Sequence, residues 1–288
     1  MDPGTLLLLT AAAAIHASWN LLAKRALDKQ VFLWLVTVVA GPLFLIPVLI
    51  AYRPFEALGW AFVLVSGLLQ ALYTLMLGRA YQHGDLSLVY PLARGTAILV
   101  VTLLGALALG EGVTPAGGLG IALVAAGIYT VHLRRLDAAS LTAPLRLLRA
   151  PGSWSALATG VIIAGYSTVD KVGVSYVPPF VYVYLGLVVC AGLLAPLMLR
   201  RPDAIAAEWR NGWWRILAVG AMNLGAYGLV LVAMQRSRVS YVASVREMSV
   251  VFAALLGTLL LREPFGRPKI AGALLIFAGI VAIALSKG

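Results

Sequence analysis

The chain has 288 residues, of which 61% are hydrophobic and only 11% are charged, whereas soluble domains average about 45–50% apolar and about 25% charged residues. This small number of charges cannot cover the surface of a soluble protein of this size. The composition therefore excludes soluble enzymes and predicts a membrane protein. The net charge of +11 would indicate a nucleic-acid partner in a soluble protein. In a membrane protein an excess of positive charge is explained first by the Lys and Arg residues that collect in cytoplasmic loops, so we expect no nucleic-acid partner.

Apolar stretches of about 20 residues, the length that crosses a bilayer, recur ten times along the chain. The first lacks a positively charged leader, so we expect a membrane helix there rather than a cleaved signal peptide. The expected spans are residues 5–22, 31–51, 60–78, 86–109, 115–133, 154–169, 179–199, 213–234, 241–261 and 270–285. The only long connections, 134–153 and 200–212, leave no room for a soluble domain, which excludes an ATP-driven pump carried on this chain.

The two halves of the sequence repeat each other. The matching pairs are Trp19 and Tyr166, Asn20 and Ser167, Lys24 and Lys171, Gln70 and Asn223, Gln82 and Gln235, Arg94 and Arg246, Glu111 and Glu263, and Gly120 and Gly272. Because five spans is an odd number, the second half must enter the membrane the other way up, as in many secondary transporters. The prediction is an all-α membrane protein whose ten transmembrane helices form two inverted-topology five-helix repeats around a central cavity. Residues 1–136 would form the first repeat, 137–153 a basic linker and 154–288 the second repeat.

Short motifs in this repeat resemble a known family. They are the span 1 pattern Trp19-Asn20-Leu21-Leu22-Ala23-Lys24, and Gly110-Glu111 and Arg262-Glu263, each followed by a glycine nine residues after the glutamate. On these motifs the chain resembles EamA-type, ten-span members of the drug/metabolite transporter superfamily over essentially its whole length. It is most similar to YddG-like bacterial amino acid exporters. The resemblance implies a cavity lined by spans 1, 3, 4, 6, 8 and 9, with spans 5 and 10 packed outside it and both termini in the cytoplasm.

Polar residues on span 1 are the first candidates for a site, because polar groups within the hydrocarbon usually face the bundle interior or a wet cavity. His16, Trp19, Asn20 and Lys24 fall on one helical face. This spacing predicts contacts to a substrate or a gate. The alternatives are hydrogen bonds to a neighbouring helix for His16 and Asn20, and a position at the helix end for Lys24.

Buried charges provide the second group of candidates. Arg94 lies inside the fourth expected span and either binds a carboxylate of the substrate or pairs with Glu247 or Asp170. Arg246 and Glu247 are adjacent and point about 100° apart on a helix, so one should line the cavity while the other pairs with a neighbouring helix. Glu247 and Asp170 are the acidic groups near hydrophobic depth, which makes them the candidates for proton coupling unless ion pairing prevents their titration.

Aromatic and amide side chains on the inner spans would suit a medium-sized amphipathic metabolite. The substrate-binding candidates are His16, Trp19, Asn20, Gln70, Tyr73, Tyr90, Arg94, Tyr166, Asn223, Tyr227, Ser244, Arg246 and Met248. The coupling or gating candidates are Lys24, Asp170, Lys171 and Glu247. A single cysteine, Cys190, excludes an intrachain disulfide, and we expect no metal site and no cofactor.

Two further patterns predict structural roles. The glycine pairs Gly120 with Gly127 and Gly272 with Gly279 predict close helix packing, within a half or between protomers. Glu111 and Glu263 each open a turn between spans, where a carboxylate favours the N-terminus of the next helix.

Together these features predict a secondary transporter of the bacterial inner membrane that exports amino acids, including aromatic ones, or similar metabolites by alternating access. Its partners would be the small-molecule substrate and membrane lipid, and it would act as a monomer or homodimer. The alternatives are a transporter of choline or other amines, nucleotide-sugars or phosphonates, a lipid scramblase or channel, and a membrane enzyme. An enzyme is disfavoured because His16, His83 and His132 are scattered.

The distribution of basic residues predicts an orientation. Fifteen Lys and Arg residues fall in connections on one face, and five fall on the face that carries both termini. By the positive-inside rule the termini lie outside, whereas the family resemblance implies that they lie in the cytoplasm.

Overall fold

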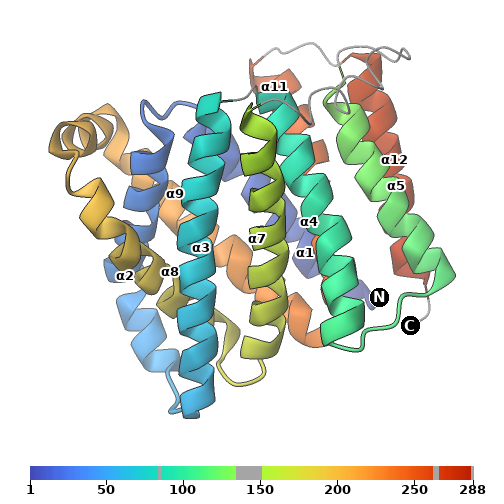
Figure 1. Cartoon of the computed structure of the whole chain (residues 1–288), viewed down its shortest axis with the longest axis horizontal. Coiled ribbons are helices and arrows are strands. Elements are labelled where there is room, and N and C mark those ends of the chain that lie inside the picture. Colours follow the sequence, from blue (N-terminus) through green and yellow to red (C-terminus); the bar gives the residue numbers. More distant parts are fainter. Residues whose placement is uncertain (84–85, 134–150, 262–265, 287–288) are drawn as a thin grey trace.

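The computed structural model describes residues 1–83, 86–133, 151–261 and 266–286, which fold into a bundle of helices without a strand (Figure 1). The helices are α1 (Pro3–Ala23), α2 (Lys29–Ala51), α3 (Ala57–His83), α4 (Leu86–Ala108), α5 (Pro115–Val131), α7 (Pro151–Gly173), α8 (Pro179–Met198), α9 (Pro202–Arg236), α10 (Val239–Arg246), α11 (Met248–Leu261) and α12 (Arg267–Leu285). The prediction of an all-α protein is confirmed for this part of the chain. Residues 137–150 of the expected linker lie outside the described residues.

Side-chain caps fix where several of these helices begin. The Asp2 side chain accepts a hydrogen bond from the backbone N–H of Thr5, and Asp28 accepts from the N–H groups of the first turn of α2. Thr114 caps α5 in the same way. Such caps satisfy backbone donors that have no partner inside the helix. Within the bilayer, helices satisfy all other backbone groups internally, which is why apolar runs of this length become helices.

Seven helical segments of the described chain are long and apolar enough to cross a membrane, and two shorter apolar helices, Leu92–Ala108 and Pro115–Val131, accompany them. Each of the ten expected spans falls on a helix or helix pair. A crossing by all ten, and their division into two inverted repeats, stay predictions.

Two details of the local structure go beyond what the sequence indicates. Within the expected span 241–261 one turn tightens at Glu247, whose N–H donates to the carbonyl of Ser244 three residues earlier, and this turn separates α10 from α11. The two helices together are still long and apolar enough to cross a membrane. The connection 200–212 is not a loop, because residues 202–211 form the first part of α9, followed by a break at Gly212. The hydrophobic periodicity of a long apolar segment does not show where a helix changes geometry at a single residue.

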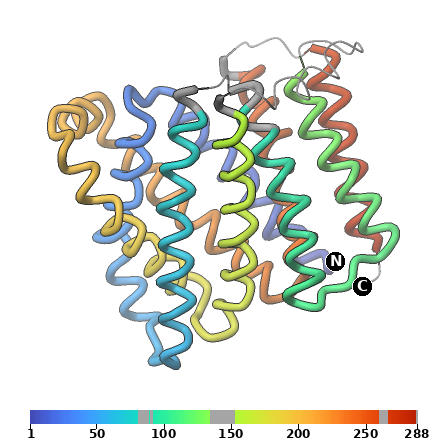
Figure 2. The backbone as a smooth tube through the Cα atoms, in the orientation of Figure 1, coloured from blue at the N-terminus to red at the C-terminus, as the bar shows by residue number. Residues whose placement is uncertain are grey.

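The helices of the two halves pack in an exchanged pattern. Helix α3 packs against α7 and α8, and its counterpart in the repeat, α9, packs against α1 and α2. Likewise α4 packs against α7, whereas α10 and α11 pack against α1. Both termini lie at the same end of the bundle (Figure 2), where the amino group of Met1 donates to the carbonyl of Ala284.

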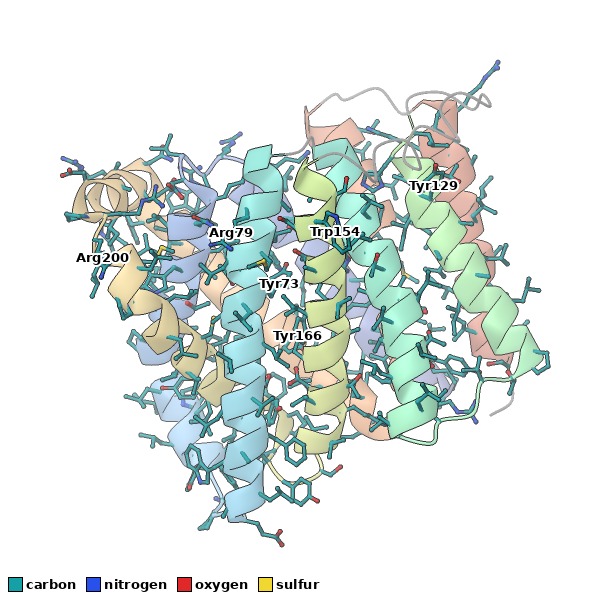
Figure 3. The ribbon with its side chains drawn as sticks, in the orientation of Figure 1. Tyr73, Arg79, Tyr129, Trp154, Tyr166 and Arg200 are labelled. Atoms are coloured by element: carbon teal, nitrogen blue, oxygen red, sulfur yellow. The ribbon has the colours of Figure 1, made fainter. Side chains whose placement is uncertain are left out.

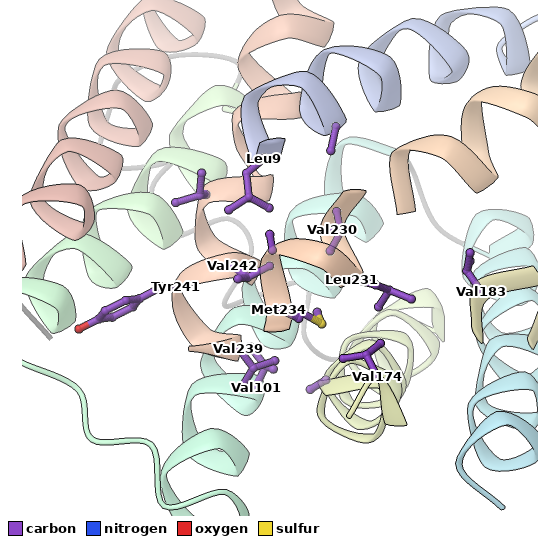
Figure 4. Close-up of a cluster of buried hydrophobic side chains, with 14 of the residues drawn as sticks. Leu9, Val101, Val174, Val183, Val230, Leu231, Met234, Val239, Tyr241 and Val242 are labelled. Carbon is purple, nitrogen blue, oxygen red and sulfur yellow. The ribbon is translucent and has the colours of Figure 1, made fainter. Parts of the chain in front are cut away.

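A hydrophobic core fills the centre, where α1, α4, α7, α9 and α10 meet (Figure 4). Leu9, Leu231 and Val242 are completely buried there. Each buried side chain of this size contributes roughly 1.5–3 kcal/mol relative to exposure to water. This core lies directly beside the charged groups described below and fixes the helices that carry them.

Helices α5 and α12 form a pair at one side of the bundle (Figure 1). The four glycines noted in the sequence lie at their contact: a Cβ atom on Gly120 would lie 2.6 Å from the carbonyl oxygen of Gly279, and one on Gly127 would lie 2.8 Å from that of Gly272. The glycine motif therefore joins the first half of the chain to the second, rather than acting within one half.

We expect Gly279→Ala to lower the free energy of unfolding by about 1–3 kcal/mol, because its methyl group would overpack against the carbonyl of Gly120. The measurement is denaturant unfolding of the protein in detergent micelles. Gly192→Ala is the matched control, since a Cβ atom there meets nothing within 4 Å, and it should leave stability unchanged or raised. Equal effects of the two substitutions would contradict the assigned contact.

Candidate functional site

The centre of the bundle holds a buried ion pair between the two halves. Nη2 of Arg94 on α4 lies 2.5 Å from Oε1 of Glu247, and Nε of Arg94 donates to Oε2 at 3.0 Å. The two side chains are only 8% and 4% exposed. This two-point contact matches the planar guanidinium to the carboxylate. Of the two roles considered for Arg94, the structure shows the internal pair with Glu247.

Arg246 is oriented differently from its neighbour Glu247. Its guanidinium lies over the ring of Tyr227, with 5.7 Å from Cζ to the ring centroid, and its Nε is buried without a hydrogen-bond partner among the described residues. A buried cationic donor without an acceptor is costly. As expected from their 100° separation, Glu247 pairs across to α4 while Arg246 points elsewhere.

A small pocket lies between these groups. It is bounded by α4, α7 and the junction of α10 with α11, and its lining residues are Arg94, Ala97, Ile98, Val101, Ile163, Ser167, Ala243, Arg246 and Glu247. Three charged groups and one hydroxyl face a mostly apolar wall. Ser167 was noted in the repeat but not among the site candidates, although its match to Asn20 was a usable signal.

A row of tyrosines leads away from Arg246. The rings of Tyr227 and Tyr166 are 6.2 Å apart, and those of Tyr166 and Tyr73 are 6.1 Å apart, each pair edge to face. Figure 3 shows Tyr73 and Tyr166 on the neighbouring helices α3 and α7. The structure thus brings together three aromatic candidates from three helices, beside one arginine.

Asp170, on α7, is fully buried and held by hydroxyl groups. Tyr182 donates to Oδ1 at 3.0 Å, and Tyr227 donates to Oδ2. Tyr227 therefore links Asp170 to Arg246. Tyr182 was missed in the sequence, because the seventh span was not among those expected to line the cavity.

The span 1 candidates form a group of their own. The rings of His16 and Trp19 meet edge to face at 4.8 Å, and Asn20 donates to the carbonyl of His16 in its own helix at 2.9 Å. Nε1 of Trp19 is buried without a hydrogen-bond partner among the described residues. Lys24 lies at the C-terminal end of α1 and is exposed. This is the position at the helix end that was given as the alternative to a site role.

The remaining substrate candidates are placed less centrally. Gln70 donates to the hydroxyl of Ser66 in its own helix, and Ser244 is fully buried with its hydroxyl bonded to Ser240. Met248 packs against the central core. Asn223 is half-buried on α9, one turn before Tyr227. The side chain of Tyr90 lies outside the described residues.

Lys171 lies at the end of the bundle rather than in the pocket. Its Nζ donates to the carbonyls of Met234 and Ser237 and lies 3.7 Å from Oε1 of Glu111. Oε2 of Glu111 accepts from the N–H of Val239 at 2.8 Å. Glu111 thus stabilises the N-terminus of α10 rather than that of the next helix, and it joins the two halves at this end. Glu263 lies outside the described residues.

The comparisons with known proteins agree with a transporter fold. Residues 150–285 match the EamA-like transporter family. The chain is a multi-pass membrane protein. The match supports the drug/metabolite transporter superfamily and a membrane transporter of small solutes. A solved structure titled only as the crystal structure of a protein superposes with a TM-score of 0.78, at 18% identity, over 99% of this chain and 98% of that one; this likeness concerns the fold alone.

One curated relative, matched over a shorter part of the chain, is an enzyme rather than a transporter. Heme A synthase of Rhodopseudomonas palustris (strain BisB5) is 40% identical over 111 residues, which is 35% of this chain. The matched stretch spans only 30% of that relative's length. The family match favours a transporter over an enzyme.

Proposed function

We propose that this protein is a secondary transporter that exports amino acids, including aromatic ones, or similar small metabolites across the bacterial inner membrane. The observation that carries the proposal is Arg246, a buried guanidinium with an unpartnered Nε beside a pocket and an aromatic row. A substrate carboxylate would supply the missing acceptor. The neighbouring tyrosines would contact an aromatic or aliphatic side chain.

Arg246 is a better carboxylate ligand than Arg94 on grounds of charge. Glu247 already neutralises Arg94 through two contacts, so a second carboxylate there would meet a like charge. The guanidinium of Arg246 lies over the ring of Tyr227, and its Nε has no hydrogen-bond partner among the described residues. A transporter of cations would instead need an acidic or aromatic cage, so this arrangement favours anionic or zwitterionic cargo over choline or other amines.

Alternating access between two inverted halves is part of the proposal. It is supported by the exchanged packing of α3 and α9 and by a pocket lined from both halves. The contacts of Lys171 and Glu111 would close the bundle at the end that carries the termini.

An enzyme is the alternative from another class, favoured only by the partial similarity to heme A synthase. That activity would require haem ligands near one another, whereas His16 lies in the bundle centre on α1 and His132 ends α5. Absorbance of the purified protein incubated with haem distinguishes the two, because specific binding would produce a Soret shift that a transporter lacks.

A thermal-shift screen tests the proposed substrate class. A ligand that binds only the folded state raises its apparent stability, by about 2.7 kcal/mol at 100 times its Kd. We expect stabilisation by one or more of the twenty amino acids. Stabilisation by amines or nucleobases alone, with no response to any amino acid, would overturn the substrate part of the proposal.

Asp170 is the proposed coupling group, because Glu247 forms an ion pair with Arg94 while the carboxylate of Asp170 accepts hydrogen bonds from the hydroxyl groups of Tyr182 and Tyr227. We expect Asp170→Asn to abolish uptake driven by a pH gradient in proteoliposomes but to keep exchange of labelled for unlabelled substrate, since exchange needs no net proton movement. Asp203→Asn, at an exposed position, is the control. Retention of gradient-driven uptake by Asp170→Asn would exclude this role.

A further inference from the structure

The first part of α9 differs from the rest of the bundle in direction. Residues 202–211 are separated from the long part of α9 by the break at Gly212. In Figures 1 and 2 this stretch, at the upper left, is seen nearly end-on, whereas the long helices run up the page. It therefore lies across the bundle direction, as a helix at a membrane surface does.

Polar contacts fix this stretch to the connection between α1 and α2. Oε1 of Glu208, itself 2% exposed, accepts from the N–H of Asp28, and the carboxylate of Asp28 pairs with Arg201. The side chains of Asn211 and Arg215 both donate to the carbonyl of Arg25. The carboxylates of Asp28 and Glu208 are thus used in contacts within the protein. These contacts hold residues 202–211 in place against the connection between α1 and α2.

Exposed residues in this stretch and directly next to it in the chain combine indole rings with cations. Trp209, Trp213 and Trp214 are 43%, 53% and 51% exposed, and Arg200 and Arg210 are exposed beside them. We call these five residues the Trp–Arg surface. Figure 3 shows Arg200 at this corner of the bundle. Exposed cations of the adjoining connection, Lys24, Arg25 and Lys29, extend the positive charge, against one exposed acid, Asp203.

We propose that the Trp–Arg surface binds the headgroups of anionic phospholipids. Indole rings favour the headgroup level of a bilayer, and cations there are attracted to anionic lipid. Neither feature alone selects a lipid, but the internal use of Asp28 and Glu208 leaves the outward charge of the surface strongly positive. The inference concerns a different part of the molecule from the transport pocket and stands independently of the substrate.

The test is quenching of tryptophan fluorescence in vesicles that contain brominated phosphatidylglycerol or brominated phosphatidylcholine. We expect the wild-type protein to be quenched more by the anionic lipid, and Trp213→Phe/Trp214→Phe to lose most of that difference. One basic residue near an anionic surface contributes about fivefold in affinity, so Arg200→Gln/Arg210→Gln should bring the preference close to one. About 0.5 M NaCl should weaken it as well.

Arg53→Gln is the matched control, because Arg53 is also exposed and lies in the connection between α2 and α3, near Trp60. It should keep the lipid preference. Equal quenching by the two lipids in the wild type would overturn the proposal, as would an unchanged preference in the double arginine variant. Displacement of the anionic lipid by inorganic phosphate at millimolar concentration would indicate a site for free anions and would also overturn it.

Discussion

Replacing Arg94 with glutamine is expected to lower the free energy of unfolding by about 3–5 kcal/mol. The reason is the burial of Glu247, which is 4% exposed on its side chain and would keep a charge without its partner. Removing one member of a buried ion pair costs far more than the pair itself contributes. Denaturant unfolding in detergent micelles measures the loss.

Two further variants separate this explanation from a general loss of packing. Arg94→Leu/Glu247→Leu should recover most of the stability, because replacing both charges with apolar groups removes the uncompensated carboxylate. Arg201→Gln breaks the more exposed pair with Asp28, in which the arginine is 41% exposed, and should cost about 1 kcal/mol or less. A loss of similar size for Arg94→Gln and Arg201→Gln would contradict the buried pair.

Replacing Arg246 with glutamine is expected to weaken substrate binding by at least about 30-fold while leaving stability nearly unchanged or raised. The loss follows from removing a buried charged donor to the substrate carboxylate, an effect of about 2–5 kcal/mol. The unchanged stability follows because Nε of Arg246 has no partner in the described structure, whereas Glu247 keeps its contacts to Arg94. The two repeat-related arginines are thus expected to differ: replacing Arg94 lowers stability, whereas replacing Arg246 weakens substrate binding.

The measurement is the concentration dependence of the thermal shift produced by the amino acid that stabilises the wild type most. Arg246→Lys should be intermediate, because it keeps the charge but loses the planar two-point geometry. Tyr52→Phe, at an exposed position distant from the pocket residues in the chain, should bind normally. Unchanged affinity in Arg246→Gln would remove Arg246 from the site.

The sequence predicts the helices and the close glycine packing well, because both depend on local patterns. Runs of about 20 apolar residues have few alternatives to a helix in lipid, and the glycines at seven-residue spacing do lie at a close helix contact. The partner of the glycine motif was not predicted: packing within a half or between protomers was expected, whereas the contact joins the two halves of one chain, which depends on how α5 and α12 meet in space.

Site residues are predicted less completely, for a similar reason. The spacing of Arg246 and Glu247 predicts that one lines the cavity while the other pairs with a neighbouring helix, and in the structure Glu247 pairs with Arg94 while both residues line the pocket. The partner of Glu247 is 153 residues away in the chain, so the spacing could not name it. Lys171 follows Asp170 directly, yet it turns to the end of α9 rather than to the pocket. Tyr182 reaches Asp170 from the next helix, α8, and no local pattern in the sequence reports that contact.

The most direct test of the central claim is substrate counterflow in proteoliposomes. Vesicles loaded with an unlabelled amino acid are diluted into the same labelled amino acid, for each of the twenty in turn. We predict transient accumulation of label for at least one amino acid with the wild-type protein, and none above empty vesicles with Arg246→Gln. Absence of counterflow for all twenty, or equal counterflow in Arg246→Gln, would contradict an amino acid transporter that binds its substrate at Arg246.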